Sequence, residues 1–309
     1  MGRQLTIATP ATRYEGPTGG PSRDYHKRMA NLTRRTLLCS AAAAAAAPFL
    51  RAAGSKLKIG VTDWNLRLGA NPDAVPLAAK LGFDGVQISF GRKIVDNRMP
   101  VDNPELIDRY LALSAQHKLP LDGTCVDMLH TNGLKSDTLA MKWVSDSIRL
   151  TKAFHTDVLL LPFFGKWAIQ SPAERDAVGD RVRELAPEAE EAGVILGLEN
   201  TISAEDNVRI IDRARSKNVL VYYDVGNSTA AGFDILKEIR WLGKDRICQI
   251  HLKDNPAYLG EGKINFPEVM RAIRDIGFTA YANLETDVHQ NSTVEADMRR
   301  NLEFTRKLL

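Results

Sequence analysis

The stretch VILGLEN (residues 194–200) is an almost continuous apolar run that ends abruptly in a glutamate and an asparagine. A short run rich in branched residues and bounded by polar ones is typical of a parallel strand covered on both faces. Helical patterns precede and follow it, at about 171–192 and 204–217. The stretch therefore predicts one strand of a βαβ arrangement, and the rest of the chain shows how often that arrangement repeats.

Similar apolar runs occur along most of the chain. They are KLKIGVTD (56–63), DGVQISF (84–90), LDGTCVD (121–127), DVLLLPFF (157–164), VLVYYDV (219–225), RICQIHLK (246–253) and AYANLET (280–286). Helical patterns alternate with them, at about 72–81, 103–117, 137–153, 171–192, 204–217, 229–241, 266–276 and 293–308.

These segments make eight strand–helix units with no Pro/Gly-rich linker between them. Eight such units predict a (β/α)8 TIM barrel that forms a single domain over residues 55–309. A doubly wound sheet is the alternative. It is disfavoured because no G-x-G-x-x-G turn follows the first strand.

Residues 1–54 differ in composition from the rest of the chain. Arg34-Arg35 precedes an apolar run that contains seven consecutive alanines and ends at Leu50, and small residues follow. Positive charge, a short apolar run and small residues in this order indicate an export signal, here of the twin-arginine type. We therefore expect a signal peptide and a periplasmic location. The apolar run is too short to span a membrane, so no stable membrane anchor is expected.

The charge of the chain is distributed unevenly. The whole sequence of 309 residues has a formal charge of +3, but residues 1–54 hold eight Lys or Arg and only two acidic residues. The remainder has 33 basic and 36 acidic side chains, a formal charge of −3. The basic character belongs to the N-terminal segment, so no nucleic-acid partner is expected.

Polar residues lie at the carboxyl ends of four successive predicted strands. They are Glu199, Asp224, His251 and Glu285. Active-site residues of a TIM barrel come from these strand ends. Counting along each strand in steps of two places all four side chains on the inward face, so they can meet at one point.

Three carboxylates held that close repel one another unless a cation neutralises them. Carboxylate oxygens together with one imidazole suit a divalent ion. We expect Mn²⁺ first, with Mg²⁺, Co²⁺ or Zn²⁺ as alternatives. Lys253 shares the inward face with His251 and is expected to hold a substrate oxygen.

Five short motifs follow one another in a distinctive order and spacing. They are LGLEN (196–200), YDVGN (223–227), QIHLKD (249–254), GEGKINF (260–266) and LET (284–286). In this order they resemble the xylose isomerase-like TIM barrel superfamily, in particular the branch with ketose 3-epimerases, hydroxypyruvate isomerase and inosose dehydratase. The similarity covers essentially all of residues 56–309.

The resemblance implies roles for individual residues. The family's metal ligands match Glu199, Asp224, His251 and Glu285. Glu199 and Glu285 also match the two carboxylates that, in the epimerases, face opposite sides of the bound sugar and exchange protons with it. Glu205 is similar to a substrate-contacting glutamate of ketose epimerases. Those enzymes have D-x-x-H on strand 6, where this chain has Asp224 and Asn227, and an asparagine binds a hydroxyl but does not titrate.

Residues and resemblance together predict a divalent-metal-dependent isomerase or epimerase of a sugar or keto-sugar. Glu199 or Glu285 would remove a proton next to a carbonyl, the ion would stabilise the enediolate, and the other glutamate would return a proton. Further substrate contacts are expected from Lys253, Trp64 and His130. The sequence leaves open which sugar is used and whether the chain forms a homo-oligomer.

Three other functions are compatible with this barrel. A dehydratase or lyase acting on a keto-sugar or inosose would use the same constellation and is the main alternative. An abasic-site endonuclease holds several zinc ions with many histidines, whereas only His130 and His251 lie at predicted strand ends here. A non-catalytic sugar-binding barrel has no need of two opposed carboxylates.

Overall fold

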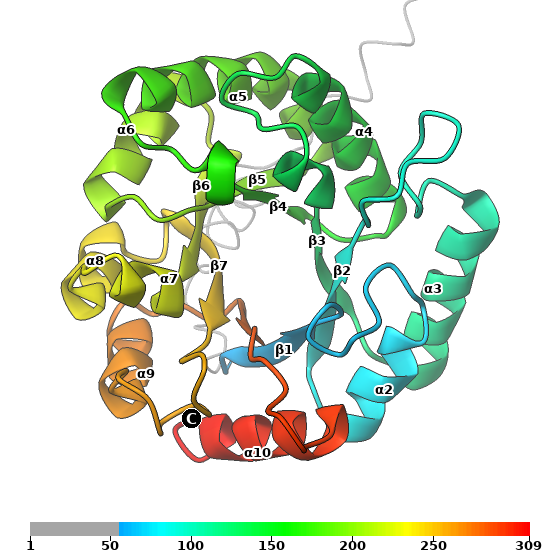
Figure 1. Cartoon of the computed structure of the whole chain (residues 1–309), viewed down its shortest axis with the longest axis vertical. Helices are drawn as coiled ribbons and strands as arrows, with labels where there is room; N and C mark the ends of the chain where they lie inside the picture. Colours follow the sequence, from blue (N-terminus) through cyan, green and yellow to red (C-terminus); the bar gives the residue numbers. More distant parts are fainter. Residues whose placement is uncertain (1–55) are drawn as a thin grey trace, which may run out of the picture. The chain divides into compact units, whose positions relative to one another are not determined.

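A computed structural model describes residues 56–309 of the chain. The predicted signal peptide and the domain boundary before residue 55 lie outside the described residues and stay predictions. Within the described part, eight strands form a closed barrel in chain order, and each neighbouring pair is parallel. Helices surround these strands (Figure 1), which confirms the predicted (β/α)8 TIM barrel.

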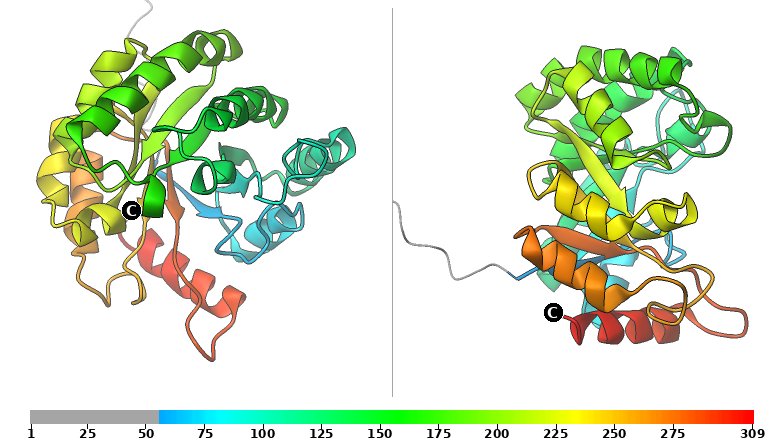
Figure 2. Two further views of the ribbon diagram at one scale, coloured as in Figure 1. Left: turned by 45° about the horizontal axis from the view of Figure 1, so that its top comes forward. Right: turned by 90° about the vertical axis from the view of Figure 1, so that its left-hand side faces the viewer.

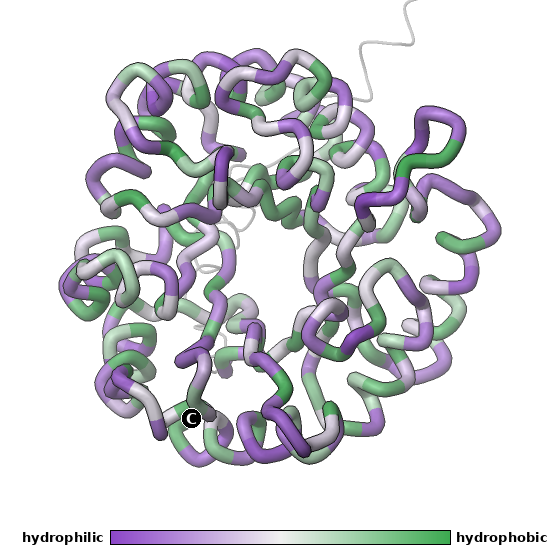
Figure 3. Tube along the Cα trace, viewed as in Figure 1, coloured by the Kyte–Doolittle hydropathy of each residue, from purple (hydrophilic) through white to green (hydrophobic). Residues whose placement is uncertain are grey.

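The strands are short and almost completely buried. They are β1 (Lys58–Thr62), β2 (Gly85–Ser89), β3 (Leu121–Cys125), β4 (Val158–Pro162), β5 (Ile195–Glu199), β6 (Val219–Asp224), β7 (Ile247–Leu252) and β8 (Tyr281–Leu284). Each of them lies within one of the predicted strand segments. Apolar residues recur along the strands and helices, while several outer loops are mainly polar (Figure 3).

Helices connect successive strands and pack outside them (Figure 2). They are α2 (Ala74–Leu81), α3 (Pro104–His117), η2 (Asp127–His130), α4 (Leu139–Ala153), η3 (Gly165–Trp167), α5 (Pro172–Ala192), α6 (Ala204–Ala214), α7 (Val225–Ala230), α8 (Ile235–Leu242), α9 (Phe266–Asp275) and α10 (Val294–Arg306). Asn103 and Ser171 cap α3 and α5, each with a proline at the first helical position. No helix of the described residues is both long and apolar enough to cross a membrane.

One predicted helix, 229–241, is confirmed only over its second part, where α8 lies, and its start is wrong. The chain there forms two helices, because α7 ends at Ala230 and Gly232 takes a left-handed conformation with φ +86° before α8 begins. The first helix starts directly after β6. Its start is fixed by Asp224, whose Oδ1 accepts a hydrogen bond from the Asn227 backbone N–H at 2.7 Å.

The interior of the barrel contains a layer of polar side chains. They are Gln87, Asp122, Tyr222, Gln249 and Asn283, and each is at most 3% exposed. Space for them comes in part from glycines on the strands, since a Cβ at Gly60 would overlap Asn283 and Asp122. This layer lies beneath the carboxyl ends of the strands and supports the residues described next.

Candidate metal centre and active site

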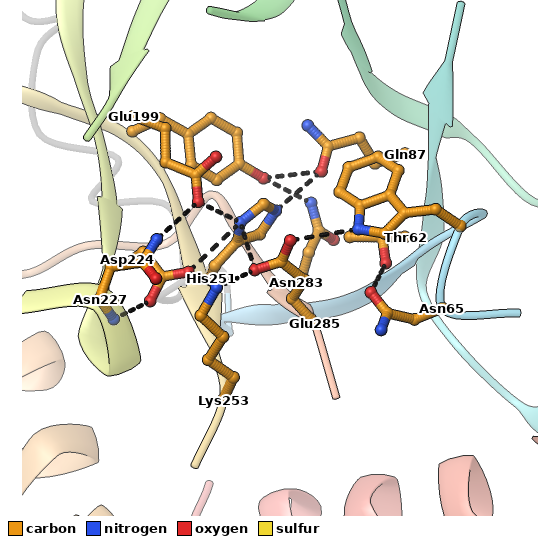
Figure 4. Close-up of polar contacts among 12 residues, drawn as sticks. Thr62, Asn65, Gln87, Glu199, Asp224, Asn227, His251, Lys253, Asn283 and Glu285 are labelled. Atoms are coloured by element: carbon orange, nitrogen blue, oxygen red, sulfur yellow. Dashed lines mark hydrogen bonds and ion pairs between the residues drawn. The ribbon is translucent and has the colours of Figure 1, made fainter. Parts of the chain in front are cut away.

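The four residues expected to bind a metal ion lie together at the carboxyl-terminal end of the barrel (Figure 4). Glu199 and Asp224 end β5 and β6, His251 lies in β7, and Glu285 directly follows β8. One ligand atom from each residue lies within 4.8 Å of all the others. His251 Nδ1 is 3.1 Å from Glu199 Oε1, 3.7 Å from Asp224 Oδ2 and 3.4 Å from Glu285 Oε2.

Gln87 of β2 orients the His251 ring. Gln87 Oε1 lies 2.9 Å from His251 Nε2 and also accepts a hydrogen bond from Tyr222 OH at 3.1 Å. Because an amide oxygen only accepts hydrogen bonds, this contact places the imidazole hydrogen on Nε2. Nδ1 is then the nitrogen that faces the three carboxylates and would bind an ion. Burial would lower the pKa of His251, but the carboxylates of Glu285 and Glu199 outweigh it and raise that pKa.

The hydrogen bonds continue from Gln87 into the interior of the barrel. Tyr222 OH accepts from Asn283 Nδ2 at 3.0 Å, and the same amide group donates to Gln249 Oε1 at 3.2 Å and to Asp122 Oδ1 at 3.3 Å. Burial raises the pKa of the Asp122 carboxyl well above its usual range. The metal-facing imidazole therefore rests on a connected polar layer that fixes its position.

Lys253 brings a positive charge to the three carboxylates. Its Nζ is 2.6 Å from Glu285 Oε2 and 2.9 Å from Asp224 Oδ2. Burial alone would lower the pKa of this ammonium, but the carboxylates of Glu285 and Asp224 outweigh that effect and raise it. Lys253 is therefore charged at neutral pH. It faces the site, as expected for a residue two positions after His251 on the same face of the strand.

The carboxyl groups of Asp224 and Glu285 respond in opposite directions to this environment. Burial raises the pKa of Asp224, and the negative charges of Glu285 and Glu199 add to the rise. Burial would also raise the pKa of Glu285, but the neighbouring His251 and Lys253 outweigh it and lower that pKa. Divergent pKa values in a shared cavity are a mark of functional sites.

The donor set fits a divalent cation. Asp224 Oδ2 is buried and accepts no hydrogen bond from within residues 56–309, although the Lys253 ammonium lies close to it. An ion with bonds of roughly 2.0–2.2 Å needs opposite ligand atoms about 4 Å apart, close to the 4.8 Å over which these atoms spread. Three carboxylates and one imidazole nitrogen suit Mn²⁺, Mg²⁺, Co²⁺ or Zn²⁺.

A cavity of about 340 Å³ opens above the cluster. Its walls include Trp64, His130, Asn227 and Lys253, all expected to contact a substrate. Trp64 Nε1 donates to Glu285 Oε1 at 3.1 Å, and Asn227 Nδ2 donates to Glu199 Oε1 at 3.3 Å. Glu205 is exposed in the first turn of α6 and is not part of this wall, so its substrate contact stays a prediction.

Arg92 and Asp127 also line the cavity, and sequence reasoning did not identify them. Asp127 Oδ2 accepts a hydrogen bond from the Gly91 N–H at 3.0 Å, and Oδ1 lies 4.0 Å from Arg92 Nε. Burial and the Arg92 charge lower the pKa of His130 to about 4, so this imidazole is neutral at neutral pH. The positions of Arg92 and Asp127 shortly after β2 and β3 are the only signal in the sequence that they contact the cavity.

The geometry allows proton transfer to and from a bound molecule. The carboxylates of Glu199 and Glu285 both line the cavity, and they reach it from strands β5 and β8. Their oxygens are held by N–H donors of neighbouring side chains, which fixes where a proton can be taken or returned. The Lys253 ammonium beside them is placed to neutralise a developing negative charge.

The sequence is similar to a known protein family and to individual relatives. The family described as xylose isomerase-like TIM barrel matches residues 75–308. The chain is 25% identical over 261 residues to a 2-epi-5-epi-valiolone 7-phosphate 2-epimerase of Actinoplanes sp., which covers 81% of this chain and 94% of that protein. It is 26% identical over 177 residues to a D-psicose 3-epimerase of Enterocloster bolteae, covering 52% of this chain and 58% of that one.

Solved structures share the same architecture. A D-psicose 3-epimerase with D-tagatose from Clostridium cellulolyticum H10 matches with a TM-score of 0.67 and 20% identity, over 82% of this chain and 99% of that one. A 3-keto-D-glucoside 4-epimerase from E. coli matches with a TM-score of 0.65 and 19% identity, over 82% and 100% of the two chains. At such identity these structures show the fold alone. The family match, in contrast, spans most of the sequence, and the chain belongs to the xylose isomerase-like TIM barrel family.

Proposed function

We propose that the protein is a divalent-metal-dependent epimerase or isomerase of a sugar or keto-sugar. The observation that carries the proposal is the convergence of Glu199 and Glu285 with Asp224 and His251 beside one cavity. Two relatives support it, because the valiolone phosphate enzyme and the D-psicose enzyme are both named as epimerases.

The ion that we propose for this site is Mn²⁺, with Mg²⁺, Co²⁺ or Zn²⁺ as alternatives. When bound, it would polarise a substrate carbonyl and stabilise the negative charge that develops after loss of the neighbouring proton. Asp224 and the Nδ1 atom of His251 would hold it from the buried side, where both side chains are at most 1% exposed. Glu199 and Glu285 would complete the set from the cavity side.

The two glutamates have the proton-transfer roles in this proposal. The lowered pKa of Glu285 keeps it ionised at neutral pH, so that it can accept a proton from the carbon next to the carbonyl. Glu199 returns a proton, taken up from solvent, from its own side of the cavity, and Glu285 releases the proton that it accepted to solvent. Return to the same carbon gives an epimer, and return to the neighbouring carbon gives an isomer. Lys253 donates a hydrogen bond to the substrate oxygen on which negative charge accumulates.

Hydrogen–deuterium exchange tests this function directly. Ketoses and keto-glucosides are incubated with the Mn²⁺-loaded protein in D₂O, and we expect deuterium at the carbon next to a carbonyl of at least one of them. Glu285→Gln and Glu199→Gln should each lower the exchange rate by roughly 10²–10⁴-fold, the contribution typical of a general acid or base. Glu191→Gln, an exposed carboxylate on α5, is the matched control.

Two results would contradict the proposal. No exchange with any sugar of the panel would remove the proton-transfer mechanism. A product that absorbs in the ultraviolet as an enone or diketone would instead identify a dehydratase, which loses a β-hydroxyl from the same anionic intermediate.

We also propose that the protein is exported to the periplasm. The support is the sequence of residues 1–54, with Arg34-Arg35 before an alanine-rich run. Replacing both arginines by lysine in the full-length chain should hold the protein in the cytoplasm, as measured by cell fractionation. Unchanged export of that variant would contradict the twin-arginine route.

A further inference from the structure

A second cavity lies beside the one that holds the two glutamates. Its volume is about 600 Å³, and it shares two wall residues, Asn227 and Lys253, with the first cavity of about 340 Å³. The first volume is at the small end of ligand pockets, which run from roughly 300 to 1,000 Å³, and suits one sugar ring. The second cavity offers additional room that a single ring leaves unused.

The two shared residues are held in place on the side of the first cavity. Lys253 Nζ is fixed by Glu285 and Asp224, and the Asn227 amide donates to Glu199 Oε1 at 3.3 Å. Figure 4 shows both residues on the Asp224 side of the cluster. The stem of Lys253 lies against Gly226, where an added Cβ would overlap Lys253 Cγ. These two side chains form the boundary between the cavities, so a molecule bound at the glutamates would have to extend past them to reach the second cavity.

The far wall of the second cavity is a preorganised loop. The Asp254 carboxylate accepts hydrogen bonds from the backbone N–H groups of Gly262 at 3.1 Å, Lys263 at 3.0 Å and Ile264 at 3.4 Å. These bonds tie the start of the loop after β7 to residues 262–264 and so fix the shape of the cavity. A preformed site costs less ordering when a ligand binds.

The walls combine apolar and polar groups in the way that a sugar ring requires. Ala230, Pro256 and Ile264 present apolar surface, while Thr229 and Lys263 bring a hydroxyl and an ammonium group. Thr229 Oγ1 donates to the Val225 carbonyl oxygen at 2.7 Å, which leaves its oxygen free to accept from a substrate hydroxyl. Pyranose rings have apolar faces and hydroxyl edges that fit such a surface.

We propose that the second cavity binds a second sugar ring, so that the substrate of this enzyme is a keto-sugar carrying an O-linked glycosyl group. The keto ring lies at Glu199 and Glu285, and the linked ring extends past Lys253 and Asn227. This inference rests on the proposed function and narrows its substrate class to keto-disaccharides and related glycosides.

The test compares single rings with their glycosylated counterparts in the deuterium exchange assay. D-fructose is paired with maltulose and lactulose, and 3-keto-glucose is paired with 3-keto-maltose. We expect kcat/KM of a disaccharide to exceed that of its single ring by roughly tenfold or more, which is the value of a modest set of added contacts. Ala230→Trp places a large side chain at the wall of the second cavity and should reduce or abolish that advantage, with exchange of the single ring retained.

The matched control is Ala231→Trp, because Ala231 is exposed like Ala230 but does not line the cavity. It should behave as the unaltered enzyme with every sugar. Equal rates for single rings and disaccharides, or equal effects of the two tryptophans, would overturn the second-ring site while the exchange itself upholds the proposed function. Absence of exchange with every member of the panel would instead contradict the proposed function.

Discussion

Replacing Gln87 by methionine removes the oxygen that accepts the hydrogen bond from His251 Nε2, at 2.9 Å, while nearly preserving side-chain length. Both side chains are completely buried, so the imidazole N–H would keep no water as a substitute partner. An unsatisfied buried donor costs about 1–3 kcal/mol. Loss of a group that orients a metal-ligating histidine typically weakens metal binding by roughly 10–100-fold, which is about 1.4–2.8 kcal/mol. The first cost falls on the folded protein with or without the ion, whereas the second is the expected loss of metal affinity.

The assay is a calorimetric titration of Mn²⁺ into chelator-treated full-length protein, with a thermal melt of each variant as the control for folding. Gln87→Met should bind Mn²⁺ about 10–100-fold more weakly than the unaltered chain. Gln87→Glu keeps an acceptor oxygen at the same place and should bind at least as tightly. Tyr222→Phe removes the other hydrogen bond to Gln87 Oε1 and leaves His251 in contact, so its effect on affinity should be small.

Unchanged Mn²⁺ affinity in a folded Gln87→Met protein would refute the reasoning. So would a lower melting temperature without any change in affinity, because Gln87 would then support the barrel without acting through His251.

Three further results are expected. Gly226→Ala should lower the exchange rate roughly tenfold, the scale of a modest overpacking cost. The added Cβ would overlap Lys253 Cγ and lie 3.0 Å from the Lys253 carbonyl oxygen, which displaces the lysine. An unaffected rate would show that the position of the Lys253 ammonium group is not critical. At a free metal concentration of about 100 times Kd, the bound ion adds about 2.7 kcal/mol to the free energy of unfolding, so chelation should lower Tm by roughly 5–10 °C. A calorimetric melt without that shift would argue against the site. Burial raises the pKa of Asp63, whose Oδ2 accepts from the backbone N–H groups of Ser89 and Ala70. Asp63→Asn keeps an accepting oxygen without the charge, so it should match or exceed the unaltered chain in urea unfolding at pH 7. That advantage should shrink as pH falls through the raised pKa towards the ordinary value of about 3.9, because the folded wild type then takes up a proton; a larger advantage at low pH would contradict it.

The strands and the candidate ligands were predictable because each depends on a pattern within a few residues. The run at 157–164 is almost wholly apolar since β4 is buried on both faces, and Glu199 ends its strand in phase with the inward positions. The start of α7 was not predictable in this way. Asp224 is both the last residue of β6 and the cap of a six-residue helix, which is too short to show a helical period.

The role of Gln87 could not be read from the sequence, because its partner His251 is 164 residues away and meets it only when the barrel closes. A glutamine in the middle of an apolar strand is a weak signal for such a contact. Glu205 is the opposite case, a residue that a sequence pattern singled out but that does not line the cavity. Its spacing from Glu199 matched a family pattern, but the first turn of α6 leaves it exposed.

The oxygen of Gln87 that both Tyr222 and His251 contact makes the evolutionary history of these positions interdependent. A lineage that lost the glutamine first would carry two stranded donors. One that lost the tyrosine hydroxyl first would lose two bonds but strand no donor, because Asn283 Nδ2 keeps Gln249 and Asp122 as acceptors. Neighbours in a shared hydrogen-bond network couple by about 0.5–3 kcal/mol, so the order of the substitutions decides whether an intermediate survives. Descendants that acquire a different ligand on β7 should therefore have changed β6 before β2.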